Sequence, residues 1–159
     1  MIENIKTSDE VFYSGTIYSS LFGKNIKVMI KKNTDMSYAE ICAEHFSSLN
    51  DSMIDKICER ISAYHKFMLE EWDSEFVSEI NKKVPCDVSG RDILKYVENP
   101  QLYISQPKGS GTGYIIEGLC EWEPEHGIDI VILNDKVVYT GSPEEITPWS
   151  DDEECSCEY

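Results

Sequence analysis

Residues 113–141, GYIIEGLCEWEPEHGIDIVILNDKVVYTG, contain the clearest strand pattern in the chain. In the first part of this stretch, apolar side chains recur at every second position, the period of a strand with one face in a core. Residues 128–133 are almost entirely apolar, as in a strand that is covered on both faces. Asn134 and Asp135 suit a two-residue turn into residues 136–140. The stretch therefore predicts three consecutive antiparallel strands.

The N-terminal part of the chain predicts a hairpin. Residues 11–19 and 24–32 are rich in Phe, Tyr, Ile and Val, and only a short segment separates them. In the second strand, Ile26, Val28 and Ile30 alternate with polar or basic residues, which gives one apolar face and one largely basic face.

Three helices are predicted between this hairpin and the final strands. Ser37 and Glu40 have the spacing of a capping box, so a first helix is expected to begin there. Apolar residues then keep helical spacing over residues 54–80, which predicts one long helix of about eight turns. A short third helix follows Ser89, and residues 102–105 predict another strand.

These elements predict a single α+β domain over residues 1–149. An antiparallel sheet is expected to combine the N-terminal hairpin with a C-terminal meander of about four strands. The long helix and the two shorter helices are expected to pack on one face of that sheet. Periodicity is lost after Gly141, and residues 150–159 predict an acidic, mobile tail.

Negative charge is concentrated in the C-terminal third of the chain. The formal net charge is −16 over 159 residues. Residues 117–159 hold 13 acidic residues and one base, Lys136, and so carry −12, whereas residues 1–116 hold 17 acidic and 13 basic residues and carry −4. Such a field opposes binding to nucleic acid and favours a basic protein partner or a metal cation.

Cysteine usage and hydropathy predict a reduced, cytoplasmic protein. Cys42, Cys58 and Cys120 fall at apolar-face positions of predicted elements, as expected of free thiols in a core. Residues 1–10 are polar, without the apolar segment of a signal peptide. No stretch approaches the roughly 20 apolar residues of a membrane span, so no membrane association is expected.

The turn within residues 122–127 holds the candidate binding residues. Two interpretations stay open. In one, Glu123, Glu125 and His126 hold a divalent cation through oxygen and nitrogen ligands. In the other, Trp122 packs into the core, Gly127 supplies a positive φ and His126 hydrogen-bonds the loop. No nucleophile has an evident base beside it, so no catalytic residue is assigned.

The run CEWEPEHGI at residues 120–128, with the strands that follow it, resembles small uncharacterised bacterial domains. In these domains a Trp-Asp-x-Glu-His-Gly hairpin precedes the last strands, and Glu123 stands here where Asp is more usual. Members are often encoded near toxin and immunity proteins, so the resemblance implies an immunity or defence role. It assigns no catalytic residue.

Two functions follow from this reading. The first is a non-enzymatic, acidic binding protein that engages a basic protein partner and needs no cofactor. The alternative is a small metal-dependent or ligand-binding enzyme with its site at the Glu-His hairpin. The first is favoured because zinc sites usually show wider ligand spacing than an adjacent Glu-His, and because no nucleophile has an evident base beside it.

Overall fold

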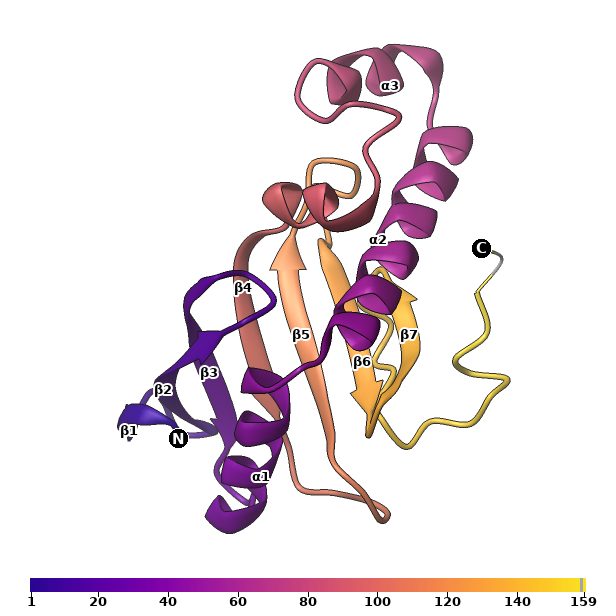
Figure 1. Ribbon diagram of the computed structural model, residues 1–159. Helices are drawn as coiled ribbons and strands as arrows, with labels where there is room; N and C mark the ends of the chain where they lie inside the picture. The colour runs from indigo at the N-terminus through magenta and orange to yellow at the C-terminus, as the bar shows by residue number, and fades with distance from the viewer. Residues whose placement is uncertain (158) are drawn as a thin grey trace.

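The computed structural model describes residues 1–157 and 159. Seven strands form one sheet in the order β1-β2-β3-β4-β5-β6-β7 (Figure 1). The strands are β1 (Glu3–Thr7), β2 (Phe12–Ser19), β3 (Lys24–Lys31), β4 (Glu98–Ile104), β5 (Gly113–Leu119), β6 (Ile128–Leu133) and β7 (Lys136–Gly141). The helices are α1 (Met36–Ser47), α2 (Asp51–Glu71), α3 (Ser74–Asn81) and the 3₁₀-helix η1 (Gly90–Tyr96).

The sheet is antiparallel except at one pair. Strands β3 and β4 are parallel neighbours, and all four helical elements lie in the connection between them. Parallel neighbours need such a crossover because a tight turn joins only antiparallel strands. The α+β fold, the N-terminal hairpin β2–β3 and the C-terminal meander β4–β7 are confirmed. The parallel pair and the edge strand β1 were not predicted.

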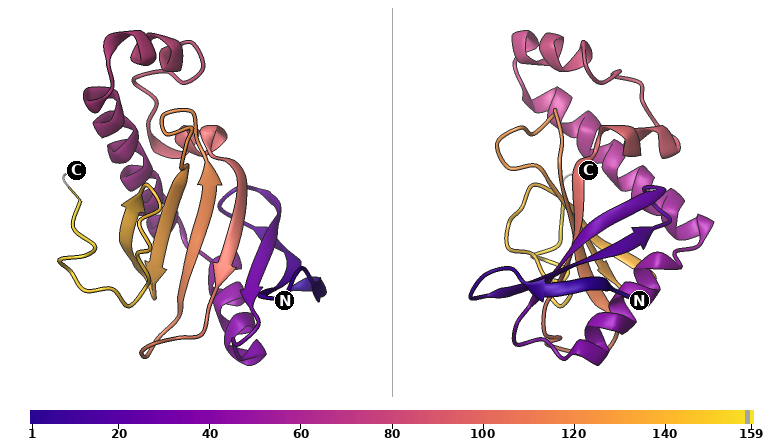
Figure 2. Two further views of the ribbon diagram at one scale, coloured as in Figure 1. Left: turned by 180° about the vertical axis from the view of Figure 1, so that it is seen from behind. Right: turned by 90° about the vertical axis from the view of Figure 1, so that its left-hand side faces the viewer.

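Helices α1 and α2 cover one face of the sheet, as the right-hand view of Figure 2 shows. Helix α1 buries Ala39, Cys42, Ala43 and Phe46, while Ile41 is 53% exposed. The capping-box prediction is wrong, because the Asp35 carboxylate caps this helix by accepting hydrogen bonds from the backbone amides of the first turn.

The predicted long helix is two helices. Helix α2 ends at Glu71, and the Asp73 carboxylate accepts hydrogen bonds from the Glu75 and Phe76 amides, both at 3.0 Å, to begin α3. The Trp72 indole nitrogen donates a 3.0 Å hydrogen bond to the Trp122 carbonyl, and this bond holds the break against the sheet. The apolar spacing continues across the break and therefore conceals it.

The opposite side of the sheet, here called the open face, carries a second, smaller apolar cluster. Ile115, Val131 and Tyr139 form it on β5, β6 and β7. Ile146, which follows β7, packs on these three side chains. The chain then returns to α2, where the Tyr159 ring centroid lies 4.9 Å from that of Phe67. The mobility of residues 150–159 stays a prediction.

Two further findings concern membrane-spanning helices and the cysteines. Within residues 1–157, no helix is both long and apolar enough to cross a bilayer. All six cysteines are free, and Cys42, Cys58 and Cys120 are buried, as their apolar-face positions predicted.

The cap at Asp73 can be tested by substitution. Asp73→Ala should destabilise the protein by about 1 kcal/mol, because it leaves the first amides of α3 without their acceptor. Glu70→Ala, on the exposed side of α2, is the control and should change the free energy of unfolding by less than about 0.5 kcal/mol. Urea denaturation measures both. Unchanged stability in Asp73→Ala would contradict a stabilising role for this cap.

Candidate functional site

Trp122 anchors the loop between β5 and β6. Its side chain is fully buried, and its indole centroid lies 4.9 Å from the His65 ring on α2. Its carbonyl oxygen accepts the hydrogen bond from Trp72. This one residue therefore joins the loop to the helices on the covered side of the sheet.

The rest of the predicted hairpin site has mixed roles. The Glu123 carboxylate is buried and lies 3.0 Å from the His126 ring, which is largely exposed. Gly127 has a φ of 82°, and a side chain there would clash with the Gly118 carbonyl oxygen. Glu125 is exposed on the loop surface. Trp122, Glu123 and Gly127 thus shape the loop, while Glu125 and His126 face solvent.

The predicted cation site is not assembled. In the part of the chain that the structure describes, no group of three or more His, Cys, Asp and Glu side chains is placed to hold a metal ion. Glu123 and His126 come together as a pair, and Glu125 does not join them. A pair supplies too few protein ligands for a defined metal centre.

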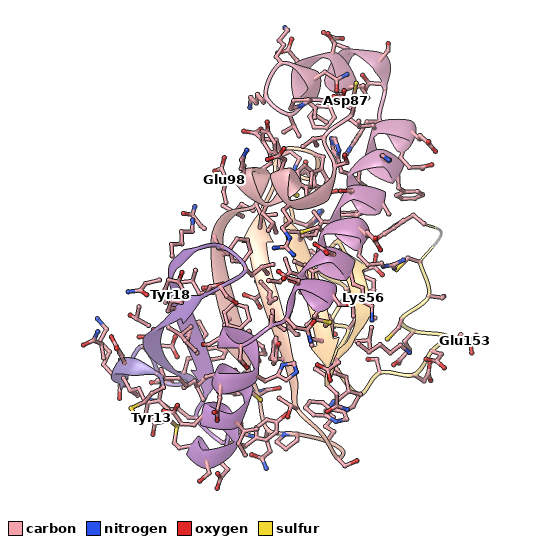
Figure 3. All side chains as sticks on the ribbon, in the orientation of Figure 1. Tyr13, Tyr18, Lys56, Asp87, Glu98 and Glu153 are labelled. Carbon is pink, nitrogen blue, oxygen red and sulfur yellow. The ribbon has the colours of Figure 1, made fainter. Side chains whose placement is uncertain are left out.

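A pocket of about 490 Å³ lies on the open face beside this hairpin, and we call it the acidic pocket. It lies where β4 begins and β5 ends, the end of β4 that the Glu98 label marks in Figure 3. A bulge in β4 between Glu98 and Gln101 puts Asn99 at a φ of 45°, a conformation that asparagine tolerates better than most residues. The lining residues are Asn99, Gln101, Glu117, Gly118, Leu119, His126, Asp129 and Pro143.

Strand register builds the polar floor of the acidic pocket. Gln101 on β4 is paired with Glu117 on β5, and Glu117 is paired with Asp129 on β6. Residues directly opposite each other on antiparallel strands share a face with their Cβ atoms about 5 Å apart. The Gln101 side-chain amide donates a 2.6 Å hydrogen bond to one Glu117 oxygen. Two carboxylates therefore lie side by side in the pocket.

Asp129 is the unusual member of this row. It is 9% exposed, and among the described residues no group donates a hydrogen bond to its carboxylate. Burial, followed by repulsion from Glu117, raises the pKa of Asp129 from 3.8 to about 7. A buried carboxyl without a donor destabilises the fold when it ionises, and such groups concentrate at functional sites.

A family model described as "Domain of unknown function (DUF6985)" matches residues 1–147. The chain belongs to this family. Membership confirms only that the chain belongs to an uncharacterised family, and the family description makes no statement about a hairpin motif, a bacterial source or toxin and immunity genes. No curated protein and no solved structure shows significant similarity to the chain.

Sequence reasoning missed the acidic pocket of this DUF6985 domain. It selected the 122–127 turn, of which only His126 lines the pocket. Glu117 and Asp129 each interrupt an otherwise apolar strand, and that is the one signal that could have selected them. Glu117 and Asp129 are paired through the register of two strands, and this register cannot be read from the sequence. Asn99 and Gln101 give no comparable signal.

The anchoring role of Trp122 predicts a large stability difference within the hairpin. Trp122→Ala should lower the free energy of unfolding of the DUF6985 domain by about 3 kcal/mol or more, because it leaves a cavity where a fully buried aromatic side chain was packed. His126→Ala should cost less than about 1 kcal/mol, since that side chain is mostly in solvent. Thermal and urea unfolding measure both. The assignment would be contradicted if Trp122→Ala left stability unchanged and His126→Ala unfolded the protein.

The raised pKa of Asp129 predicts a pH-dependent gain from Asp129→Asn. Between pH 3.8 and about 7 the folded protein holds a proton that the unfolded chain has released. The Asp129 carboxyl therefore makes its full contribution to the free energy of unfolding below pH 3.8, and this contribution is lost as the pH rises through 7. Asn is always neutral, so the variant should gain on the order of 1 kcal/mol or more over wild type by pH 8.

Urea denaturation at pH 5 and pH 8 checks this prediction of a growing difference. Glu125→Gln is the matched control, because Glu125 is exposed and should leave the pH dependence of stability unchanged. Parallel wild-type and Asp129→Asn curves at all pH values would contradict the assignment of a buried, protonated Asp129.

Proposed function

We propose that this DUF6985 domain is a non-enzymatic, cytoplasmic binding protein whose acidic open face engages a basic protein partner. The observation that carries the proposal is the convergence of unpaired carboxylates beside the acidic pocket. Pro143 lines that pocket and Ile146 packs on the open face, so the exposed Glu144 and Glu145 between them lie close to its rim.

Few of these carboxylates have a cation within the protein. In the described part of residues 117–159, ion pairs within 4.0 Å engage Glu121, Glu123, Asp135 and Asp152. The Asp152 pair with Lys136 is long, at 3.9 Å, and both side chains are exposed, so it contributes little. The remaining charge, including Glu153 on the C-terminal segment (Figure 3), is available to an external partner.

The open face is electrically uneven. Lys27 on β3 lies at one end of the row that continues through Gln101 and Glu117, and Asp129 on β6 lies at the other end. Such a gradient orients an approaching charged protein and raises its association rate. It opposes nucleic acid, because the lysines of β3 are too few to offset the surrounding acidic residues.

The finer form of the proposal is an immunity role, in which the basic partner is a toxin or nuclease. It rests on the resemblance of the 120–128 run and on the acidic face. An acidic surface that covers a basic, nucleic-acid-binding surface would block access to phosphate backbones by charge complementarity alone.

The proposed function predicts a salt-dependent association. A basic protein recovered from the native host at low salt should associate at least about tenfold more slowly when salt is raised from 25 to 300 mM, because screening shortens the reach of the field. Replacing Asp151, Asp152, Glu153 and Glu154 with Asn and Gln should slow association if the tail steers the partner. Stopped-flow mixing measures both rates.

Matched replacement of Glu59, Glu70 and Glu71 with Gln, on α2 across the sheet, should leave association unchanged and serves as the control. The proposal is overturned if no basic protein binds at low salt. It is equally overturned if purified protein carries stoichiometric metal and a turnover that Glu125→Gln abolishes.

A further inference from the structure

The acidic pocket contains a carboxylate that the fold itself does not explain. Asp129 is more than nine-tenths buried, lines the pocket and receives no hydrogen bond from the described residues. Structural carboxylates in such positions are paired with a cation or with several donors. None of the described residues supplies such a partner to Asp129.

We propose that the acidic pocket is the binding site for a single guanidinium group, the side chain of an arginine on the basic protein partner. The proposal rests on the proposed function for the identity of the partner as a basic protein. It adds the position of the contact, the residues that make it and the chemical group that enters.

The acceptors in the pocket match a planar, multiply donating cation. Asp129 offers two oxygens, and Glu117 offers the oxygen that Gln101 does not occupy. The two carboxylates come from directly opposite positions on β5 and β6, so one guanidinium can donate to both. A guanidinium has five N–H donors in a fixed fork, which suits acceptors held by a rigid sheet.

The walls of the pocket favour arginine over lysine. Leu119 and Pro143 are apolar residues of its lining, and Leu119 is 52% exposed, so it is free to cover an alkyl stem. A guanidinium is more weakly hydrated than an ammonium and loses less when it is buried beside Asp129. Both features act on the same ligand, because an arginine has an apolar stem and a planar head.

The charges around Asp129 give the binding a pH dependence. Glu117 faces it from β5, Gln101 and Asn99 are neutral neighbours on β4, His126 lines the pocket from the loop, and the buried Tyr139 lies on β7. Burial and Glu117 hold Asp129 protonated below about pH 7, so a cation must displace that proton. Binding should therefore strengthen between pH 6 and pH 8.

The experiment titrates the full chain with butylguanidinium and, separately, with butylammonium, and follows backbone amide shifts by NMR. Butylguanidinium should give saturable shifts at Glu117, Asp129 and His126, with a Kd at least threefold lower than that of butylammonium. Asp129→Asn and Glu117→Gln should each weaken it at least about tenfold, because each removes one charged acceptor. Glu59→Gln, on α2, is the matched control and should bind as wild type does.

Titrations at pH 6 and pH 8 distinguish the contribution of Asp129 from that of His126. His126→Gln should keep the gain in affinity between pH 6 and pH 8, while Asp129→Asn should lose it. Loss of the gain in His126→Gln alone would overturn the assignment to Asp129, and tighter butylammonium binding would overturn the choice of arginine.

Failures of this proposal and of the proposed function are distinguishable. If the basic protein binds in a salt-dependent way but Asp129→Asn and Glu117→Gln bind it as tightly as wild type, the pocket assignment is overturned and the binding function stands. If butylguanidinium saturates the pocket while no basic protein binds, the pocket assignment holds and the basic-partner function is overturned.

Discussion

The register of the central strands fixes both the apolar core and the acidic pocket. Strands β4, β5 and β6 are locked so that Leu102 lies opposite Ile116, and Ile116 opposite Ile130, on the covered face. A slip of one residue would exchange the two faces of a strand, because side chains alternate with a period of two. The same register sets Glu117 beside Asp129, so one set of hydrogen bonds defines both the core and the acidic pocket.

The loop after β5 connects the covered face of the sheet with the open face. Trp122 is held on the helix side by His65 and by the hydrogen bond from Trp72. A few residues later the chain enters β6 at Ile128 and places Asp129 on the open face. The Glu123–His126 pair and Gly127 fit between these two positions, so the conspicuous residues of the turn support the pocket more than they form it.

The energetic cost of Asp129 connects structure with function. An apolar or amide side chain at this position would stabilise the fold at neutral pH, since an ionised, unpartnered carboxylate is expensive to bury. Local destabilisation of this kind is characteristic of binding sites, where an incoming group supplies the missing partner. In this proposal, the exposed carboxylates of the C-terminal third attract a basic partner, and the acidic pocket binds one of its side chains.

Local periodicity and charge were enough to predict the α+β class, the β2–β3 hairpin, the strands of the meander and the acidic C-terminal third, because both follow directly from the order of residues. Features that depend on contacts between distant segments could not be predicted in this way. Every residue of strand β1 is exposed and the strand has no apolar pattern, so only its pairing with β2 reveals it. The break at Trp72 keeps the helical spacing of apolar residues, and it is seen in the structure through the Asp73 cap of α3 and the hydrogen bond from Trp72 to Trp122. The acidic pocket joins residues from β4, β5, β6 and two loops. No local sequence pattern predicts that these residues meet, because strand register is set by interactions across the whole sheet.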